Sequence, residues 1–114
     1  MKIVIKSRGG GKSTYLIKRS IETQLPIVVT RRSSIDDLIK SSEMVKKLMN
    51  IDLPFPTPIF YEDLIRNNRG RARNVLVDNL PTMIEQILGS RVSEVTCSSE
   101  EVLFDFSNKR PFDE

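Results

Sequence analysis

The chain has 114 residues and a net charge of +3, which gives it the length of one domain spanning residues 1–114 and a mildly basic character compatible with a nucleic-acid partner. It contains no histidine, which excludes histidine-based catalysis and histidine-ligated metal sites. Its single Cys97 cannot form an internal disulfide, and no apolar run approaches the roughly 18 residues of a membrane span. We therefore expect a cytoplasmic protein without a membrane partner.

Residues 2–17 have the order of a phosphate-binding P-loop: an apolar strand, a glycine-rich turn and the start of a helix. Glycines let successive N–H groups turn toward phosphate oxygens, and the helix adds the positive end of its dipole. The pattern G-x-x-x-x-G-K-[ST] lacks its first glycine here, because Lys6 stands at that position. The predicted nucleotide-binding residues are Gly9, Gly10, Gly11, Lys12, Ser13 and Thr14.

Two of these side chains have a predicted chemical role. Lys12 reaches the β- and γ-phosphates, and the hydroxyl of Ser13 ligates Mg²⁺. The alternative interpretation is a glycine-rich turn followed by a chance Lys-Ser pair. The strand before the turn and the helix after it favour the P-loop.

The next elements predict an α/β fold with parallel strands. Residues 13–22 have the apolar spacing of a helix, and residues 27–30 are a β-branched run that is too short for one. Arg31 and Arg32 follow at the carboxyl end of this strand. They are interpreted either as contacts for phosphate or DNA, or as part of a solvated turn.

A second helical region is expected to start near Ser33, which has Ser-x-x-Asp spacing to Asp36. The paired serines at residues 41–42 are expected to interrupt it, with a further helical piece at about residues 43–50. Residues 51–58 carry three prolines and predict an extended connector.

A strand that ends in an acidic residue is the second feature that favours nucleotide binding. Residues 75–79 read Val-Leu-Val-Asp-Asn, and the Asp78 carboxylate is predicted to hold Mg²⁺ together with Ser13. Residues 59–65 predict a short strand and one helical turn. The basic residues 66–73 are either a contact for nucleic acid or a neighbouring subunit's phosphates, or a solvated loop.

The last third of the chain predicts one more helix and further strand. Pro81 suits the first turn of a helix whose apolar stripe runs over residues 84–88 and which Gly89 ends. Residues 92–98 are predicted to form the last strand of the sheet. Alternating apolar residues in the tail, residues 100–114, indicate either an edge strand or a segment that docks on a partner.

These residues resemble a known group of proteins. The loop SRGGGKST is similar to those of phage terminase large subunits and helicase-like ATPases, in which the first glycine is often missing and an arginine commonly stands at the position of Arg8. The layout as a whole also resembles small phage-encoded P-loop proteins. The likeness covers residues 7–17, 28–31, 51–56, 77–79 and 94–98.

The resemblance implies a three-layer P-loop NTPase (RecA-like) fold of minimal size, with a mainly parallel central sheet of about four to five strands. It also implies that Arg8 acts with Lys12 in catalysis by stabilising charge at the γ-phosphate. In these relatives a water-activating glutamate follows the strand aspartate, whereas this chain has Asn79, which cannot take a proton. Glu85, about two helical turns further on, is expected to point away.

The sequence therefore predicts a P-loop NTP-binding protein that binds ATP, or another NTP, with Mg²⁺. Weak or partner-dependent ATPase activity in phage DNA metabolism or packaging is expected. The candidate partners are DNA, a phage DNA-processing protein and further copies of the chain, and the expected location is the host cytoplasm. The alternative functions are a non-catalytic, nucleotide-bound interaction module and a small-molecule kinase.

Overall fold

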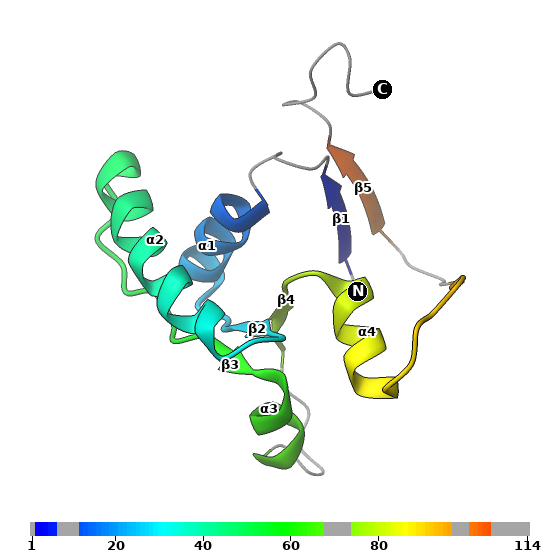
Figure 1. Cartoon of the computed structure of the whole chain (residues 1–114). Helices are drawn as coiled ribbons and strands as arrows, with labels where there is room; N and C mark the ends of the chain where they lie inside the picture. Colours follow the sequence, from blue (N-terminus) through cyan, green and yellow to red (C-terminus); the bar gives the residue numbers. More distant parts are fainter. Residues whose placement is uncertain (1, 7–11, 68–73, 97–100, 106–114) are drawn as a thin grey trace. The chain divides into compact units, whose positions relative to one another are not determined.

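The computed structural model describes residues 2–6, 12–67, 74–96 and 101–105. They belong to two compact units, one made of Met1–Lys12 and Ser93–Glu114 and the other of Ser13–Val92. The architecture is α/β, as the sequence predicts, and the described residues contain four helices and five strands (Figure 1). Every pairing between the described strands is parallel.

The first unit contains a pair of strands. β1 (Lys2–Lys6) pairs with β5 (Glu101–Asp105), so that Ile3 lies opposite Val102 and Ile5 opposite Phe104. β1 is the apolar run that precedes the glycine-rich segment, as predicted. β5 lies in the tail, for which an edge strand was one of the two interpretations of the alternating apolar residues.

The second unit contains a three-stranded sheet in the order β3-β2-β4. β2 (Ile27–Val29) is central and pairs with both β3 (Ile59–Phe60) and β4 (Leu76–Val77). All three strands were predicted from their short apolar runs. The sheet is nevertheless smaller than the four to five strands that were expected.

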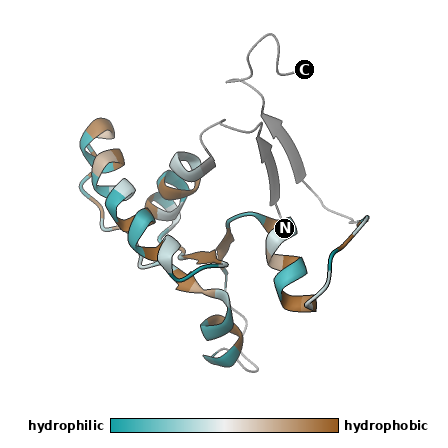
Figure 2. Cartoon of the chain, in the orientation of Figure 1, coloured by the Kyte–Doolittle hydropathy of each residue, from teal (hydrophilic) through white to brown (hydrophobic). Residues whose placement is uncertain are grey.

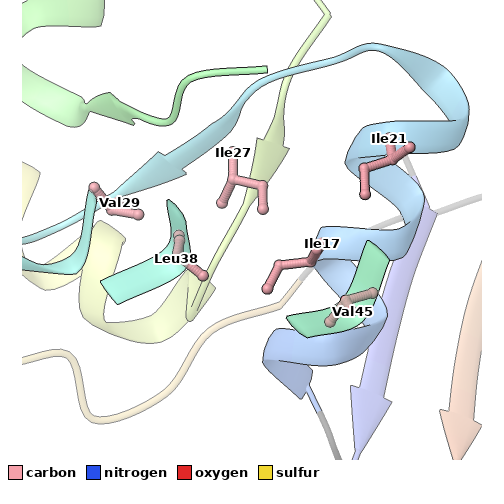
Figure 3. Close-up of a cluster of buried hydrophobic side chains, with 6 residues drawn as sticks. All are labelled: Ile17, Ile21, Ile27, Val29, Leu38 and Val45. Carbon is pink, nitrogen blue, oxygen red and sulfur yellow. The ribbon is translucent and has the colours of Figure 1, made fainter. Parts of the chain in front are cut away.

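The core of the second unit forms on both faces of β2, whose residues are all almost completely buried. Its side chains alternate between two hydrophobic clusters, as the pleat of a strand requires. Helices α1 (Lys12–Thr23) and α2 (Ser33–Met49) cover one face, where they meet β2 (Figure 3). Helices α3 (Tyr61–Asn67) and α4 (Leu80–Leu88) contribute to the cluster on the other face. The first cluster consists of Ile17, Ile21, Ile27, Val29, Leu38 and Val45.

The end of α1 is held by side chains that bond to backbone carbonyls. Ser20 is fully buried, and its hydroxyl donates to the carbonyl of Leu25 at 2.6 Å. Gln24 has a left-handed backbone with φ of 57° and ends the helix. Its side-chain amide donates to the carbonyls of Ile21 at 2.7 Å and Pro54 at 2.9 Å, which ties α1 to the proline-rich connector.

α2 is one continuous helix, and the interruption predicted at residues 41–42 is wrong. Ser42 is 1% exposed, and its hydroxyl donates to the carbonyl of Ile39 at 2.6 Å within the helix. The small side chain is therefore buried with its polar group satisfied, and the backbone has no reason to leave the helix. The helix start is near the predicted residue, but its cap position is Arg32, without a side-chain cap.

The segment after α4 corrects a second prediction. Residues 91–96 form no strand, although residues 92–98 were predicted to be the last strand of the sheet, and residues 97–98 lie outside the described part. The backbone N–H of Val92 donates to Oε2 of Glu85 at 2.8 Å instead of pairing with a neighbouring strand.

None of the helices that the structure describes has the length and apolar content needed to cross a membrane.

Candidate functional site

The carboxyl ends of β2, β3 and β4 lie at one edge of the sheet, because the three strands run in the same direction. Arg31 follows closely after β2, Tyr61 begins α3 directly after β3, and Asp78 follows β4. In parallel α/β sheets this edge is where ligands bind. The predicted metal ligand Asp78 therefore stands at the edge at which such proteins carry their sites.

Asp78 continues the ladder of β4 by one residue. Its N–H donates to the carbonyl of Val28 at 3.2 Å, just as the N–H of Leu76 donates to that of Pro26 at 3.0 Å. Residues two apart in a strand share a face, so Asp78 belongs to the face of Leu76, which packs against the cluster under α1 and α2. The half-buried carboxylate has no hydrogen bond or ion pair with any described residue.

Ser13 and Thr14 lie in the first turn of α1, and both side chains are exposed. The first N–H groups of a helix have no partner within it and can bind an anion. Only residues 24–26 separate α1 from the amino end of β2, and the 12-residue helix is about 18 Å long. Because a helix that packs on the strand it precedes runs back along it, its first turn is directed toward the carboxyl edge, on the same face as Asp78.

The rest of the predicted P-loop is only partly described. Lys12 is the first residue of α1, and five residues separate it from Lys6, the last residue of β1. Four predicted site residues lie outside the described residues: Arg8, Gly9, Gly10 and Gly11. The basic residues 68–73 do so as well, whereas Arg66 lies in the last turn of α3.

The two arginines after β2 differ in their surroundings. The Arg32 guanidinium donates to both carboxylate oxygens of Asp63, at 3.1 and 3.2 Å, and lies 4.4 Å from the ring centroid of Phe60. It thus connects the start of α2 to α3 and is already occupied by protein groups. Arg31 is exposed and makes no ion pair with a described residue, so of the two it is the one available to a phosphate.

Asn79 stands at the junction between β4 and α4 with a left-handed backbone, φ 62° and ψ 70°. Its carbonyl accepts the N–H of Met83 at 3.1 Å, while its side chain makes no cap hydrogen bond. Asparagine tolerates this conformation better than most residues with a Cβ atom. The left-handed backbone gives a structural reason for asparagine at this position, where the resembling terminases and helicases carry glutamate. The sequence alone did not reveal this reason.

Glu85 is engaged in the structure of the turn that follows α4. Its carboxylate accepts the N–H of Val92, and its carbonyl accepts the N–H of Gly89 at 2.8 Å. Gly89 has φ of 68° and ends the helix, as predicted from its sequence position. Glu85 therefore holds residues 89–92 against α4.

Tyr61 is a buried polar residue that the sequence did not single out. Its hydroxyl lies 3.2 Å from Oε1 of Gln86 and 3.3 Å from Oε1 of Glu62, and donates to one of them at a time. Burial raises the pKa of this hydroxyl, and the charge and hydrogen bond of Glu62 raise it further. The side chain packs with Val28 and Met83 on the face opposite Asp78, so it joins α3 to α4.

Comparison of the chain with known protein families, with curated proteins and with solved structures found no match.

Proposed function

We propose that this chain is a P-loop protein that binds ATP, or another NTP, together with Mg²⁺. The observation that carries the proposal is the position of α1, which begins at Lys12 after β1 and the glycine-rich segment. The Lys-Ser-Thr run thereby forms the first turn of the helix, which is the arrangement that a phosphate-binding P-loop needs. Asp78, at the carboxyl edge of a parallel sheet and without a partner among the described residues, supports the proposal independently.

The donor groups fit a nucleotide with its magnesium ion. Carboxylate and hydroxyl oxygens are the hard ligands that Mg²⁺ prefers, and Asp78 and Ser13 provide one of each. Lys12 would neutralise the β- and γ-phosphates, and the amides from Gly9 to Ser13 would bind phosphate oxygens. Arg8 would stabilise charge at the γ-phosphate. Bound Mg²⁺ would supply further charge neutralisation.

Hydrolysis by the chain alone is proposed to be weak or to depend on a partner. Asn79 cannot take a proton from water, and the Glu85 carboxylate is bonded to a backbone N–H. The resemblance to terminase and helicase loops supports a RecA-like fold and a role in phage DNA metabolism or packaging. DNA, a DNA-processing protein or neighbouring copies of the chain would then complete the active site.

A non-catalytic, nucleotide-bound module is the second candidate. It is favoured by the left-handed backbone at Asn79, because a glutamate at that position would carry a conformational cost of about 1 kcal/mol. The two candidates share the binding site and differ only in turnover. ATP turnover measured with and without DNA separates them: stimulated phosphate release supports the ATPase, and binding without turnover in both conditions supports the module.

The binding proposal is tested by calorimetric titration of ATP·Mg²⁺ and GTP·Mg²⁺ into the full chain. Lys12→Ala should weaken binding by roughly 10- to 100-fold, because it removes a charged hydrogen bond worth about 1.5–3 kcal/mol. Lys18→Ala, on the exposed face of the same helix, is the matched control and should leave affinity unchanged. Equal affinities for the wild type and Lys12→Ala would refute the proposal.

The metal role of Asp78 has its own test. Asp78→Asn should weaken ATP binding in the presence of Mg²⁺ and have little effect when the ion is removed with a chelator. Asp52→Asn, in the exposed connector, controls for the loss of one negative charge. If Asp78→Asn weakens binding equally with and without Mg²⁺, the carboxylate does not act through the metal.

A further inference from the structure

An open groove of about 320 Å³ lies between the first turn of α1 and the second half of α2. Val45, which is 6% exposed, connects it to the core, whereas Met44 and Leu48 are 65% and 79% exposed. Thr14 lines the groove from α1. Figure 2 shows hydrophobic colour on the last turns of α2, where the groove lies.

The exposed apolar side chains are not needed by the core of this unit. Leu38, Ser42 and Val45 are the residues of α2 that are buried, and their spacing defines one face of the helix. Met44 and Leu48 are four residues apart and form a second, neighbouring stripe. A stripe of this kind beside a groove marks an interaction surface, because exposing large apolar side chains to water is unfavourable.

Lys40 continues the same stripe one turn earlier, so that the order along the helix is a cation followed by two apolar residues. Its ammonium group makes no ion pair with any described residue. The groove lining contains this one cation and no carboxylate. Methionine side chains, which are flexible, adapt readily to a partner's surface.

We propose that this groove docks an acidic amphipathic helix of a partner protein. Apolar side chains of that helix, spaced three and four residues apart, would cover Met44 and Leu48, and a glutamate or aspartate would pair with Lys40. Charge complementarity favours such a partner over a second copy of the chain. A second copy using the same groove would bring another lysine and no carboxylate to it.

The test uses the full chain and fluorescein-labelled synthetic peptides of about 18 residues, long enough to form a helix. The first peptide is an amphipathic helix of leucine and glutamate, the second replaces each glutamate with lysine, and the third scrambles the first. Fluorescence anisotropy is measured without nucleotide, so that the result does not depend on ATP binding. The acidic amphipathic peptide should bind at least about tenfold more tightly than the other two.

Variants locate the peptide on the groove. Leu48→Glu and Lys40→Glu should each weaken binding of the acidic peptide by about tenfold or more, and Lys40→Glu should improve binding of the basic one. Leu53→Glu changes an exposed leucine outside the groove lining and should bind like the wild type. Circular dichroism verifies that the variants keep the wild-type helix content.

Three outcomes would overturn the proposal. The first is equal binding of the acidic and basic peptides, and the second is unchanged binding to Leu48→Glu. The third is sedimentation showing that the wild type self-associates while Leu48→Glu is monomeric, which would assign the groove to a second copy. None of these outcomes bears on the titrations of ATP·Mg²⁺.

Discussion

Substitutions at Asn79 test whether its left-handed backbone affects the stability of the fold, because the backbone and the side chain contribute to stability separately. The residue has φ of 62° and caps α4 without a side-chain hydrogen bond. Removing the amide group therefore loses no described bond, and the effect of a substitution comes from the backbone conformation. A residue with a Cβ atom loses about 1–2 kcal/mol in the left-handed region, whereas glycine avoids that strain.

We expect Asn79→Ala to lower the free energy of unfolding by about 1 kcal/mol, because part of the strain is already present with asparagine. Asn79→Gly should lie within about 0.5 kcal/mol of the wild type, since the relief of strain offsets the greater freedom of glycine in the unfolded chain. Asn79→Glu, which restores a carboxylate after Asp78, should lose about as much as the alanine variant.

The assay is urea denaturation followed by far-ultraviolet circular dichroism, since the chain contains no tryptophan. A loss of about 1 kcal/mol shifts the midpoint by roughly 0.5 M at a typical urea dependence of about 2 kcal/mol per M. Asn50, with φ of 52° at the end of α2, serves as a parallel case in which alanine should again be worse than glycine. An alanine variant as stable as the wild type, with glycine the least stable, would refute the argument.

Ile17→Ala removes a side chain that is 0% exposed and should lower the free energy of unfolding, measured by urea denaturation, by about 2–5 kcal/mol. Lys18→Ala, at an exposed position, should change it by less than about 0.5 kcal/mol, and equal effects of the two substitutions would contradict the assigned core. A double-mutant cycle on Arg32 and Asp63 should give a coupling of about 0.2–1 kcal/mol that falls as salt is added, because Arg32 is largely exposed; a coupling that does not respond to salt would argue against an ion pair. The pKa of Tyr61 is raised above its usual 10.0, so just above pH 10 the folded state keeps a proton that the unfolded chain has already lost. The hydroxyl of Tyr61 therefore contributes fully to stability below pH 10, and this contribution is lost as pH rises through the higher pKa of the folded state. Tyr61→Phe should show a smaller loss of stability above pH 10 than the wild type, and identical pH profiles would show that the hydroxyl does not titrate in this way.

The elements that the sequence predicted best are those whose signals are local. The β-branched run that forms β2 is too short for a helix and follows a proline, so the sequence predicted a buried strand. α1 was recognised from the spacing of Ile17 and Ile21, and the end of α4 from Gly89. In each case the decisive property belongs to one residue or to neighbours along the chain.

The two wrong predictions involve contacts between residues that the sequence does not relate. Ser42 looks like a helix breaker by composition, but its burial and its bond to the carbonyl of Ile39 in its own helix make it a normal helical residue. Val92 looks like the start of a strand, but Glu85 takes its N–H. Which competing partner a hydroxyl or an N–H finds depends on packing and not on local preference.

The sequence by itself predicted a phosphate-binding pattern, a helix over residues 13–22 and an aspartate at the end of a strand, because each depends on residue type and order. The tertiary structure decided which groups are engaged. It holds Arg32 against Asp63, bonds Glu85 to the backbone and leaves Asp78 without a partner among the described residues. It also leaves the stripe of Met44 and Leu48 exposed beside α1. Such facts follow from which faces of helices and strands meet, and that is set by packing among segments far apart in the chain.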